Sequence, residues 1–250
     1  MGVSAYLRSP TALAWTVLAV VGVWATVVAG WELAFALASG TAIAEAAFLD
    51  GLGAVALVGV VAGATLAASA AVWLPCSAAM AYAVGRRSRG DSVGLRRTVR
   101  AVRARSEPLY RWAKTTAAVG PIADRILTEK DTARAEVAAG CEGFVLPAIV
   151  LDAATLSSAV DRANRVVPAP GRRRIQAVGL VGTTLLVAGA AGLTVVAERV
   201  PSLPVEPAIP GPVPAVVVAL LVGLVVTAAV DTARRADVYA TADLHEGFRR

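Results

Sequence analysis

The sequence predicts an all-α membrane protein, a polytopic transmembrane bundle of about six helices with both termini in the cytoplasm. Composition is the first observation: 57% of the 250 residues are hydrophobic, 17% are charged, and the mean hydropathy is +0.66. A soluble domain is nearer half apolar and a quarter charged. The second observation is that the apolar residues occur in long runs, and the third is that arginines gather in a few of the loops between them.

Four apolar segments are long enough to cross the roughly 30 Å hydrocarbon core, which needs about 20 helical residues. In the first segment, Trp31 and Glu32 fall near the far surface, where aromatic residues are expected. The second segment is longer than one crossing requires, and we expect it to tilt or to kink at Pro75. The four segments cover residues 11–38, 51–84, 175–197 and 213–230.

Loop charges orient these segments. The basic loop 85–105 contains eight arginines and one aspartate, and 161–174 contains five arginines and one aspartate. Residues 39–50 carry two acids and no basic residue, and the proline-rich loop 198–212 carries one arginine. The positive-inside rule places the first two loops inside and the other two outside. The prediction is a single domain over residues 1–250, a multi-pass protein of the inner (cytoplasmic) membrane.

Residues 106–160 begin and end on the same side, so they cross the membrane twice or not at all. The two candidate crossings are 107–127 and 137–160. The first has charged residues on both sides of a short apolar centre, and a central charge costs roughly 2.5–3.5 kcal/mol on insertion. Six crossings are expected, and four crossings with an interfacial hairpin are the alternative.

Two acids in 137–160, Glu142 and Asp152, are candidate intramembrane acids. On one straight helix they lie about 15 Å apart along the axis, too far for a carboxyl pair that shares acid–base chemistry at roughly 5–10 Å. Asp152 is the deeper acid, and we expect it to protonate or to pair with a cation or a hydroxyl such as that of Thr155. It is either a proton or cation site or a structural acid.

Small residues recur at every fourth position in the first two segments. This spacing lets helix backbones approach closely, so we expect an antiparallel packed hairpin, with a homodimer face as the competing use. The residues are Gly22, Thr26, Gly30 and Ala34 in the first segment, and Gly59, Gly63, Ala67 and Ala71 in the second.

The stretch 91–105, DSVGLRRTVRAVRAR, predicts a helix capped by Asp91. An apolar stripe of Leu95, Val99 and Val102 lies beside a stripe of arginines. Such a helix suits the inner leaflet, where anionic headgroups attract it. The candidate lipid contacts are Arg96, Arg97, Arg100 and Arg103. Nucleic acid would use the same arginines, but no aromatic platform or known motif accompanies them, so it is not expected as a partner.

Motifs for chemistry are sparse. The chain has one histidine, His245, and two cysteines without CxxC spacing, so a Cys/His zinc site within one chain is close to excluded. HExxH, GxSxG and P-loop motifs do not occur. We predict no catalytic, cofactor-binding or metal-ligating residue.

A non-enzymatic, membrane-organising or partner-binding role is favoured. Its partners would be the lipid bilayer with its anionic headgroups, and a membrane protein or a second copy of the chain. The alternative is a small-solute or proton-coupled permease component that uses Asp152. An intramembrane enzyme is least favoured.

Two short patterns carry a resemblance to a known family. The first is the run Phe144-Val145-Leu146-Pro147, followed by Asp152, Ala159 and Arg162. The second is Tyr239-Ala240-Thr241, followed by Glu246-Gly247-Phe248. The chain resembles an uncharacterised family of polytopic prokaryotic integral membrane proteins of unknown function. The resemblance implies six helices and supplies no reaction. Ala163 stands where the family has a serine, and the tryptophan–glycine that usually follows is absent.

Overall fold

The computed structural model describes residues 2–39, 52–116, 141–166 and 213–247, and every regular element in these ranges is an α-helix. The all-α prediction is therefore confirmed for the described chain. The helices are α1 (Gly2–Leu7), α2 (Pro10–Ser39), α4 (Leu52–Ser88), α5 (Leu95–Ala104), α6 (Ser106–Thr116), α9 (Glu142–Leu151), α10 (Leu156–Val166) and α12 (Val213–Gly247).

Two of the described helices contain a stretch long and apolar enough to cross a membrane, Pro10–Leu37 and Gly59–Ser88. A third span exists if the bent pair Gly143–Leu151 and Leu156–Arg165 counts as one. Two or three such helices suggest an association with a membrane.

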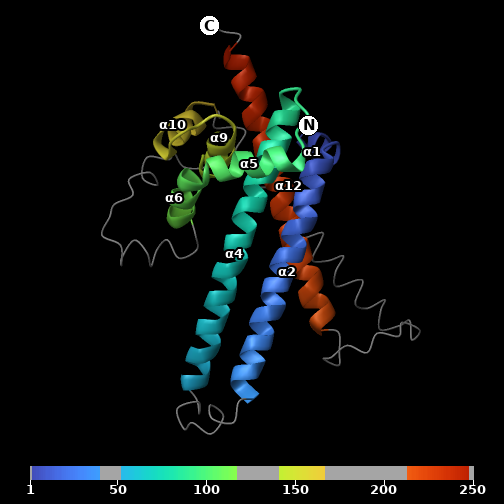
Figure 1. Cartoon of the computed structure of the whole chain (residues 1–250), viewed down its shortest axis with the longest axis vertical. Coiled ribbons are helices and arrows are strands. Elements are labelled where there is room, and N and C mark those ends of the chain that lie inside the picture. The colour runs from blue at the N-terminus through green and yellow to red at the C-terminus, as the bar shows by residue number, and fades with distance from the viewer. Residues whose placement is uncertain (1, 40–51, 117–140, 167–212, 248–250) are drawn as a thin grey trace, which may run out of the picture.

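The long helices α2 and α4 lie side by side and run in opposite directions, and α12 packs against both (Figure 1). The short helices gather around one end of this bundle. We call that end the head, and define it as α1, α5, α6, α9 and α10 with residues 76–88 of α4 and 229–242 of α12. Residues 17–37 of α2 and 56–75 of α4 extend away from the head, and we call them the apolar hairpin.

α4 changes its surroundings at Pro75. Residues 76–85 are all buried, whereas Val61 is the only buried residue among the described side chains of 56–75. The helix continues through Pro75 as a single element, although proline has no N–H to give to the carbonyl of Ala71. One continuous helix therefore joins the exposed hairpin to the core of the head.

The apolar hairpin exposes large apolar side chains along its length. Soluble proteins rarely expose a contiguous apolar patch of more than a few hundred Å². Residues 17–37 cover about 30 Å of helix, which matches the hydrocarbon thickness of a bilayer. Lipid is the medium that suits this surface. The exposed side chains are Val17, Leu18, Val21, Trp24, Val28, Trp31, Leu33, Phe35, Val60 and Leu66.

The two helices of the hairpin pack closely, as their small residues predict, but only one helix contributes its glycines. A Cβ added to Gly22 would lie 2.7 Å from Val72 Cγ1, and one added to Gly30 would overlap the Thr65 side chain. Around Gly59 and Gly63 nothing lies within 4 Å of such an atom. The expectation that both stripes face each other is therefore wrong for α4, because its stripe is turned away from α2.

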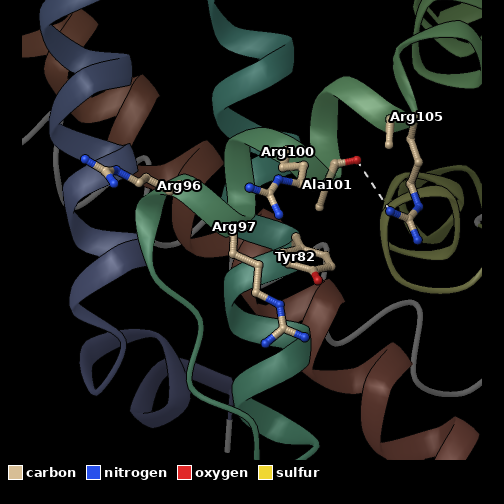
Figure 2. Close-up of a pocket in the computed structure, with 7 residues that line it drawn as sticks. Tyr82, Arg96, Arg97, Arg100, Ala101 and Arg105 are labelled. Carbon is tan, nitrogen blue, oxygen red and sulfur yellow. Dashed lines mark hydrogen bonds between the residues drawn. The ribbon is translucent and has the colours of Figure 1, made fainter.

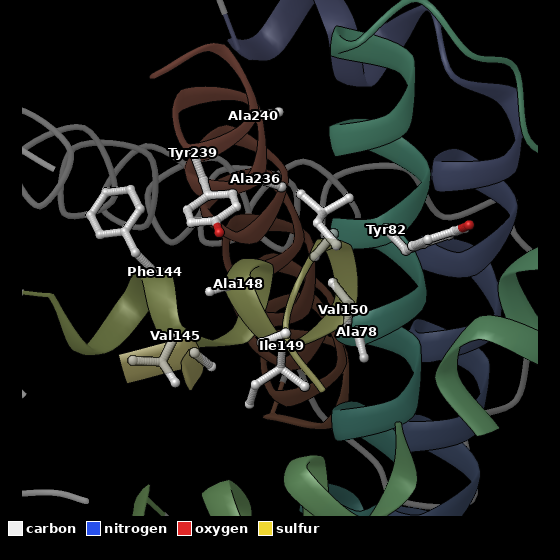
Figure 3. Close-up of a cluster of buried hydrophobic side chains, with 14 of the residues drawn as sticks. Ala78, Tyr82, Phe144, Val145, Ala148, Ile149, Val150, Ala236, Tyr239 and Ala240 are labelled. Carbon is white, nitrogen blue, oxygen red and sulfur yellow. The ribbon is translucent and has the colours of Figure 1, made fainter. Parts of the chain in front are cut away.

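The core of the head is built around α9 (Figure 3). This helix is apolar on all sides, and Phe144, Val145 and Ile149 are at most 1% exposed. Such a helix must be buried in protein or lipid. Alanines on α4 and α12 let it approach both, and a Cβ on Gly85 would meet Leu151 Cδ1 at 2.5 Å.

The described part of the candidate crossing 137–160 is not one continuous helix. α9 ends at Leu151, α10 starts at Leu156, and the two axes differ by 118°. The break is built into the sequence, because Thr155 and Ser158 cap α10 reciprocally, with each backbone N–H donating to the other's hydroxyl at 3.3 Å. Thr155 is therefore not the partner of Asp152.

The other predicted segments are described to different extents. α6 covers the first part of 107–127 as far as Thr116, and residues 117–127 lie outside the described chain. Residues 175–197 lie outside the described chain. α12 includes all of 213–230 and continues to Gly247.

A test of the hairpin compares Gly30→Ala with Gly63→Ala. The first change would push Thr65 out of the position in which its hydroxyl donates to the carbonyl of Val61 at 2.8 Å. Overpacking of this kind costs about 1–3 kcal/mol, so the midpoint of thermal unfolding in neutral detergent should fall. Gly63→Ala meets open space and should leave the midpoint unchanged or raise it, because alanine favours helix. Equal midpoints for the two variants would contradict this packing.

Candidate functional site at the basic end of the bundle

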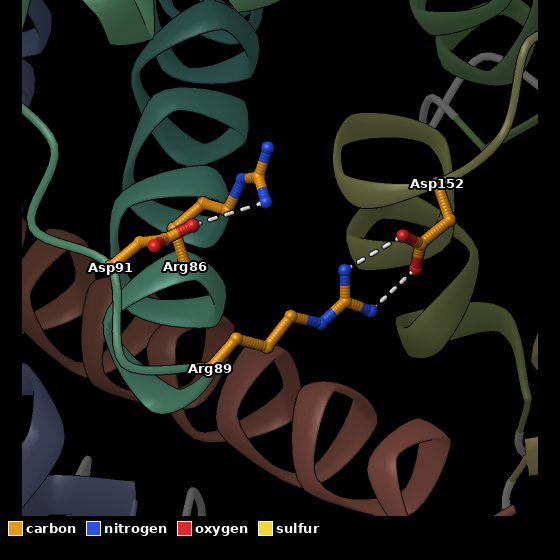
Figure 4. A network of polar contacts seen from close by, with 4 residues as sticks. All are labelled: Arg86, Arg89, Asp91 and Asp152. Atoms are coloured by element: carbon orange, nitrogen blue, oxygen red, sulfur yellow. Dashed lines mark hydrogen bonds and ion pairs between the residues drawn. The ribbon is translucent and has the colours of Figure 1, made fainter. Parts of the chain in front are cut away.

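The last turn of α4 is the point at which distant parts of the chain meet. Arg86 pairs with Asp91 at 3.3 Å and lies over the Tyr82 ring, with its Cζ 5.7 Å from the centroid. Ser88 donates to Asp237 of α12 at 2.5 Å. Arg89, one residue later, binds Asp152 (Figure 4). The first arginines of the predicted basic loop therefore form contacts that hold distant parts of the chain together.

The Arg89–Asp152 pair is bidentate. Nη1 donates to Oδ1 at 2.7 Å and Nη2 donates to Oδ2 at 2.6 Å. The two side chains are only 13% and 14% exposed. The planar guanidinium matches the carboxylate fork, which makes this one of the stronger forms of ion pair. Asp152, the candidate intramembrane acid, therefore has a specific cationic partner.

The position of Asp152 explains why it needs that partner. It is the C-cap residue of α9, where the unpaired carbonyls of the helix carry a partial negative charge. A carboxylate at this end is repelled, and partial burial removes the water that would otherwise screen it. Arg89 offsets both effects, so the pair fastens the turn between α9 and α10 to the end of α4.

Glu142, the other candidate acid, is the first residue of α9, and its side chain lies outside the described residues. Its neighbour Gly143 lies directly against the guanidinium of Arg235, which a Cβ would overlap. That guanidinium pairs with Asp231 at 2.7 Å, and its Cζ lies 6.0 Å from the centroid of the Phe144 ring.

Asp237 was missed by the sequence analysis, which treated the chain after residue 230 as a cytoplasmic tail. Its side chain is 7% exposed, and within the described chain the Ser88 hydroxyl is its only side-chain partner. A signal for it does exist. Asp237 follows Ala233 by four residues on the face of α12 that also buries Ala236 and Ala240, and an acid inside a small-residue stripe indicates a buried polar contact.

α5 begins later than predicted. Its N-cap is Gly94, with no side-chain cap, so the expectation that Asp91 caps this helix is wrong. Asp91 pairs with Arg86 instead. Two hydrogen bonds hold the segment to α2: Trp15 Nε1 donates to Thr98 Oγ1 at 3.0 Å, and Thr11 Oγ1 donates to the Val93 carbonyl at 2.7 Å. Thr98 and Ala101 form the buried face of the helix.

The rest of α5 faces outward. The predicted apolar stripe is exposed in part, because Leu95 is 44% and Val99 is 49% exposed while Val102 packs against the core of the head. The four candidate lipid contacts, Arg96, Arg97, Arg100 and Arg103, are all exposed. In the described part of the chain none of the four forms an ion pair.

The described residues contain no group of three or more His, Cys, Asp and Glu side chains that could hold a metal ion. Cys76 and Cys141 are both free and buried.

No protein-family model, curated protein or solved structure matches the chain. The resemblance to a polytopic membrane family therefore stays a prediction.

The Arg89–Asp152 pair can be tested against the neighbouring Arg86–Asp91 pair. Asp152→Ala leaves a shielded guanidinium without its counter-charge, which should cost about 2–4 kcal/mol, or about 5–10 °C in the thermal midpoint of a chain of this size. Asp91→Ala removes the acid of a pair whose side chains are 31% and 52% exposed, and should cost less than about 1 kcal/mol.

The double variant Arg89→Leu/Asp152→Leu distinguishes the loss of a counter-charge from the loss of side-chain packing. Removing both charges should restore most of the decrease in thermal midpoint caused by Asp152→Ala, because no shielded charge is then left without a partner. A midpoint for Asp152→Ala equal to that of Asp91→Ala would show that the pair is not a structural fastening.

Proposed function

We propose that the protein is a non-enzymatic, multi-pass protein of the inner membrane whose basic end docks on anionic lipid and positions a partner at the membrane surface. The observation that carries the proposal is the outward face of α5. There, four exposed arginines without a carboxylate partner in the described chain stand beside exposed Leu95 and Val99. Apolar side chains flanked by arginine suit the boundary between headgroups and acyl chains.

The tryptophans support a position for the membrane. Trp15 and Trp73 are half-buried where the apolar hairpin joins the head, packed against a small cluster that includes Val23 and Val225. Trp31 is 60% exposed near the other end of α2. Along the helix, sixteen residues from Trp15 to Trp31 span about 24 Å, somewhat less than the roughly 30 Å hydrocarbon core, so both tryptophans fall near its edges, where aromatic residues are enriched. The head then lies at the cytoplasmic surface.

Four crossings suit this arrangement better than six. α9 is about 15 Å long, half of the hydrocarbon core, and Asp152 at its end is fastened to the last turn of α4. Both ends of α9 lie in the head, because Cys141 and Leu151 belong to its buried core. The interfacial-hairpin alternative accounts for this, with crossings by α2, α4, residues 175–197 and α12.

The permease alternative depends on Asp152 being free to bind a proton or a cation. Proton or cation coupling needs an acid that can exchange its partner, and both oxygens of Asp152 accept from Arg89. Within the described chain, we find no observation that favours transport over docking.

Membrane topology is tested with a cysteine at position 132, which lies between α6 and α9 in the sequence. In the four-crossing arrangement Thr132→Cys stays in the cytoplasm. A membrane-impermeant thiol reagent should then label it in inverted vesicles and not in intact cells. The native cysteines are buried, and the unsubstituted chain gives their background. Labelling from the outside of intact cells would establish six crossings instead.

Lipid docking is tested with a fluorophore on Val99→Cys, in the full chain reconstituted into nanodiscs. Nitroxide-bearing lipids should quench the label more strongly in anionic discs than in neutral ones, and salt should weaken this difference. Arg103→Gln should reduce the quenching, because Arg103 lies about 40° from Val99 around the helix.

The matched control is Arg87→Gln, which removes the same charge from an exposed position on α4. It should leave the quenching unchanged. A label that is unquenched in both kinds of disc would show that this face of α5 does not meet lipid.

A further inference from the structure

A cavity of about 470 Å³, wide open to the surroundings, lies between α5 and α4 (Figure 2). Arg96, Arg97 and Arg100 line it from α5, Arg105 lines it from the end of that helix, and Tyr82 lines it from α4. Its remaining walls are Ala101 and Ala104. The volume falls within the range of small-molecule sites, roughly 300–1,000 Å³.

The charge of this cavity is unbalanced. Its lining has four guanidinium groups and no carboxylate. The acids nearest in sequence are engaged elsewhere, since Asp91 pairs with Arg86 and Glu107 with Arg111. Arg96 and Arg100 are four residues apart on one helix, a spacing at which like charges destabilise the helix by a few tenths of a kcal/mol. An external anion would relieve this repulsion.

The cavity offers several N–H donors from separate arginines, which suits a ligand with more than one oxygen. Arg105 is held in place, because its Nη1 donates to the Ala101 carbonyl at 3.4 Å (Figure 2). The ring of Tyr82 is buried, and its hydroxyl has no hydrogen-bond partner in the described chain. Guanidinium groups present parallel N–H donors that match phosphate oxygens in pairs.

We propose that this cavity binds a ligand whose phosphate groups carry at least two negative charges. The size exceeds what one phosphate fills, so a substituent or a second phosphate has room beside the methyl groups of Ala101 and Ala104. The same chemistry is offered by a soluble phosphorylated compound and by a phospholipid headgroup.

The cavity shares Arg96, Arg97 and Arg100 with the arginines proposed to meet lipid, but Leu95, Val99 and Arg103 are not part of its lining. At about 100° per residue, Arg97 and Ala104 lie roughly opposite Leu95 and Val99 around the helix. Arg103 lies beside Val99 and does not line the cavity. The two proposals therefore share three arginines and are distinguished by their readouts: quenching of a label at position 99 reports contact with lipid, and titration with a soluble anion reports binding in the cavity.

The experiment measures binding to the full chain in neutral detergent by isothermal titration calorimetry at about 150 mM salt, where long-range attraction is screened. Inorganic pyrophosphate represents the soluble source, and dioctanoyl phosphatidic acid represents the headgroup. We expect saturable one-to-one binding of at least one probe. Binding of pyrophosphate alone assigns a soluble ligand, binding of the lipid alone assigns a headgroup, and binding of both supports the shared chemistry.

Two matched variants decide whether the cavity is the site. Arg97→Gln should weaken the bound probe about tenfold, and Arg103→Gln, which removes the same charge outside the cavity, by less than about threefold. Both arginines are exposed, so the thermal midpoints without ligand should match that of the unsubstituted chain. Equal weakening by the two variants, or no saturable binding of either probe, overturns the proposal.

Discussion

The last turn of α4 is the contact on which the rest of the head depends. From Arg86 and Ser88 in that turn, and from Arg89 directly after it, ion pairs or hydrogen bonds reach Asp91, Asp237 and Asp152. The latter two lie 149 and 63 residues away from their partners in the sequence. Because α4 is one continuous helix from Leu52 to Ser88, the turn that holds these acids is rigidly joined to the apolar hairpin. The head is thereby fixed at a set distance along the hairpin.

Hydropathy predicted the long helices well and their surroundings poorly. The segments 11–38 and 51–84 correspond to α2 and α4 within a few residues. Within α4, however, residues 59–71 and 76–85 are similarly rich in alanine and valine, yet the first stretch is exposed and the second is buried. Hydropathy measures the transfer out of water, and it does not distinguish lipid from the interior of a protein. α9 is ambiguous in the same way, because its apolar sequence suits a helix buried in protein and also part of a segment that crosses a membrane.

The polar contacts of the site were harder to foresee than the helices. Asp152 was identified from its apolar surroundings, but Arg89 could not be named as its partner, since a single sequence carries no record of which distant residues meet. The cap of α5 was misplaced for a local reason. Asp91 has the preferred chemistry for an N-cap, yet the turn that follows α4 contains Gly90 with φ at +93°, a left-handed conformation suited to glycine. This turn lets Asp91 reach back to Arg86, and the helix then starts four residues later.

Two groups of arginines in the basic loop have different physical roles. Arg86 and Arg89 are partly shielded and paired with acids, so their charge contributes to the fold. The exposed arginines of α5 have no carboxylate partner in the described chain. They repel one another, and no ion pair in the described chain offsets this repulsion. Repulsion of this kind is removed when anions from outside the chain are bound, and it is larger when salt does not screen it. The positive-inside rule counts both groups equally. The geometry separates them, because the charge of the first group is used in ion pairs within the head and the charge of the second has no carboxylate partner in the described chain.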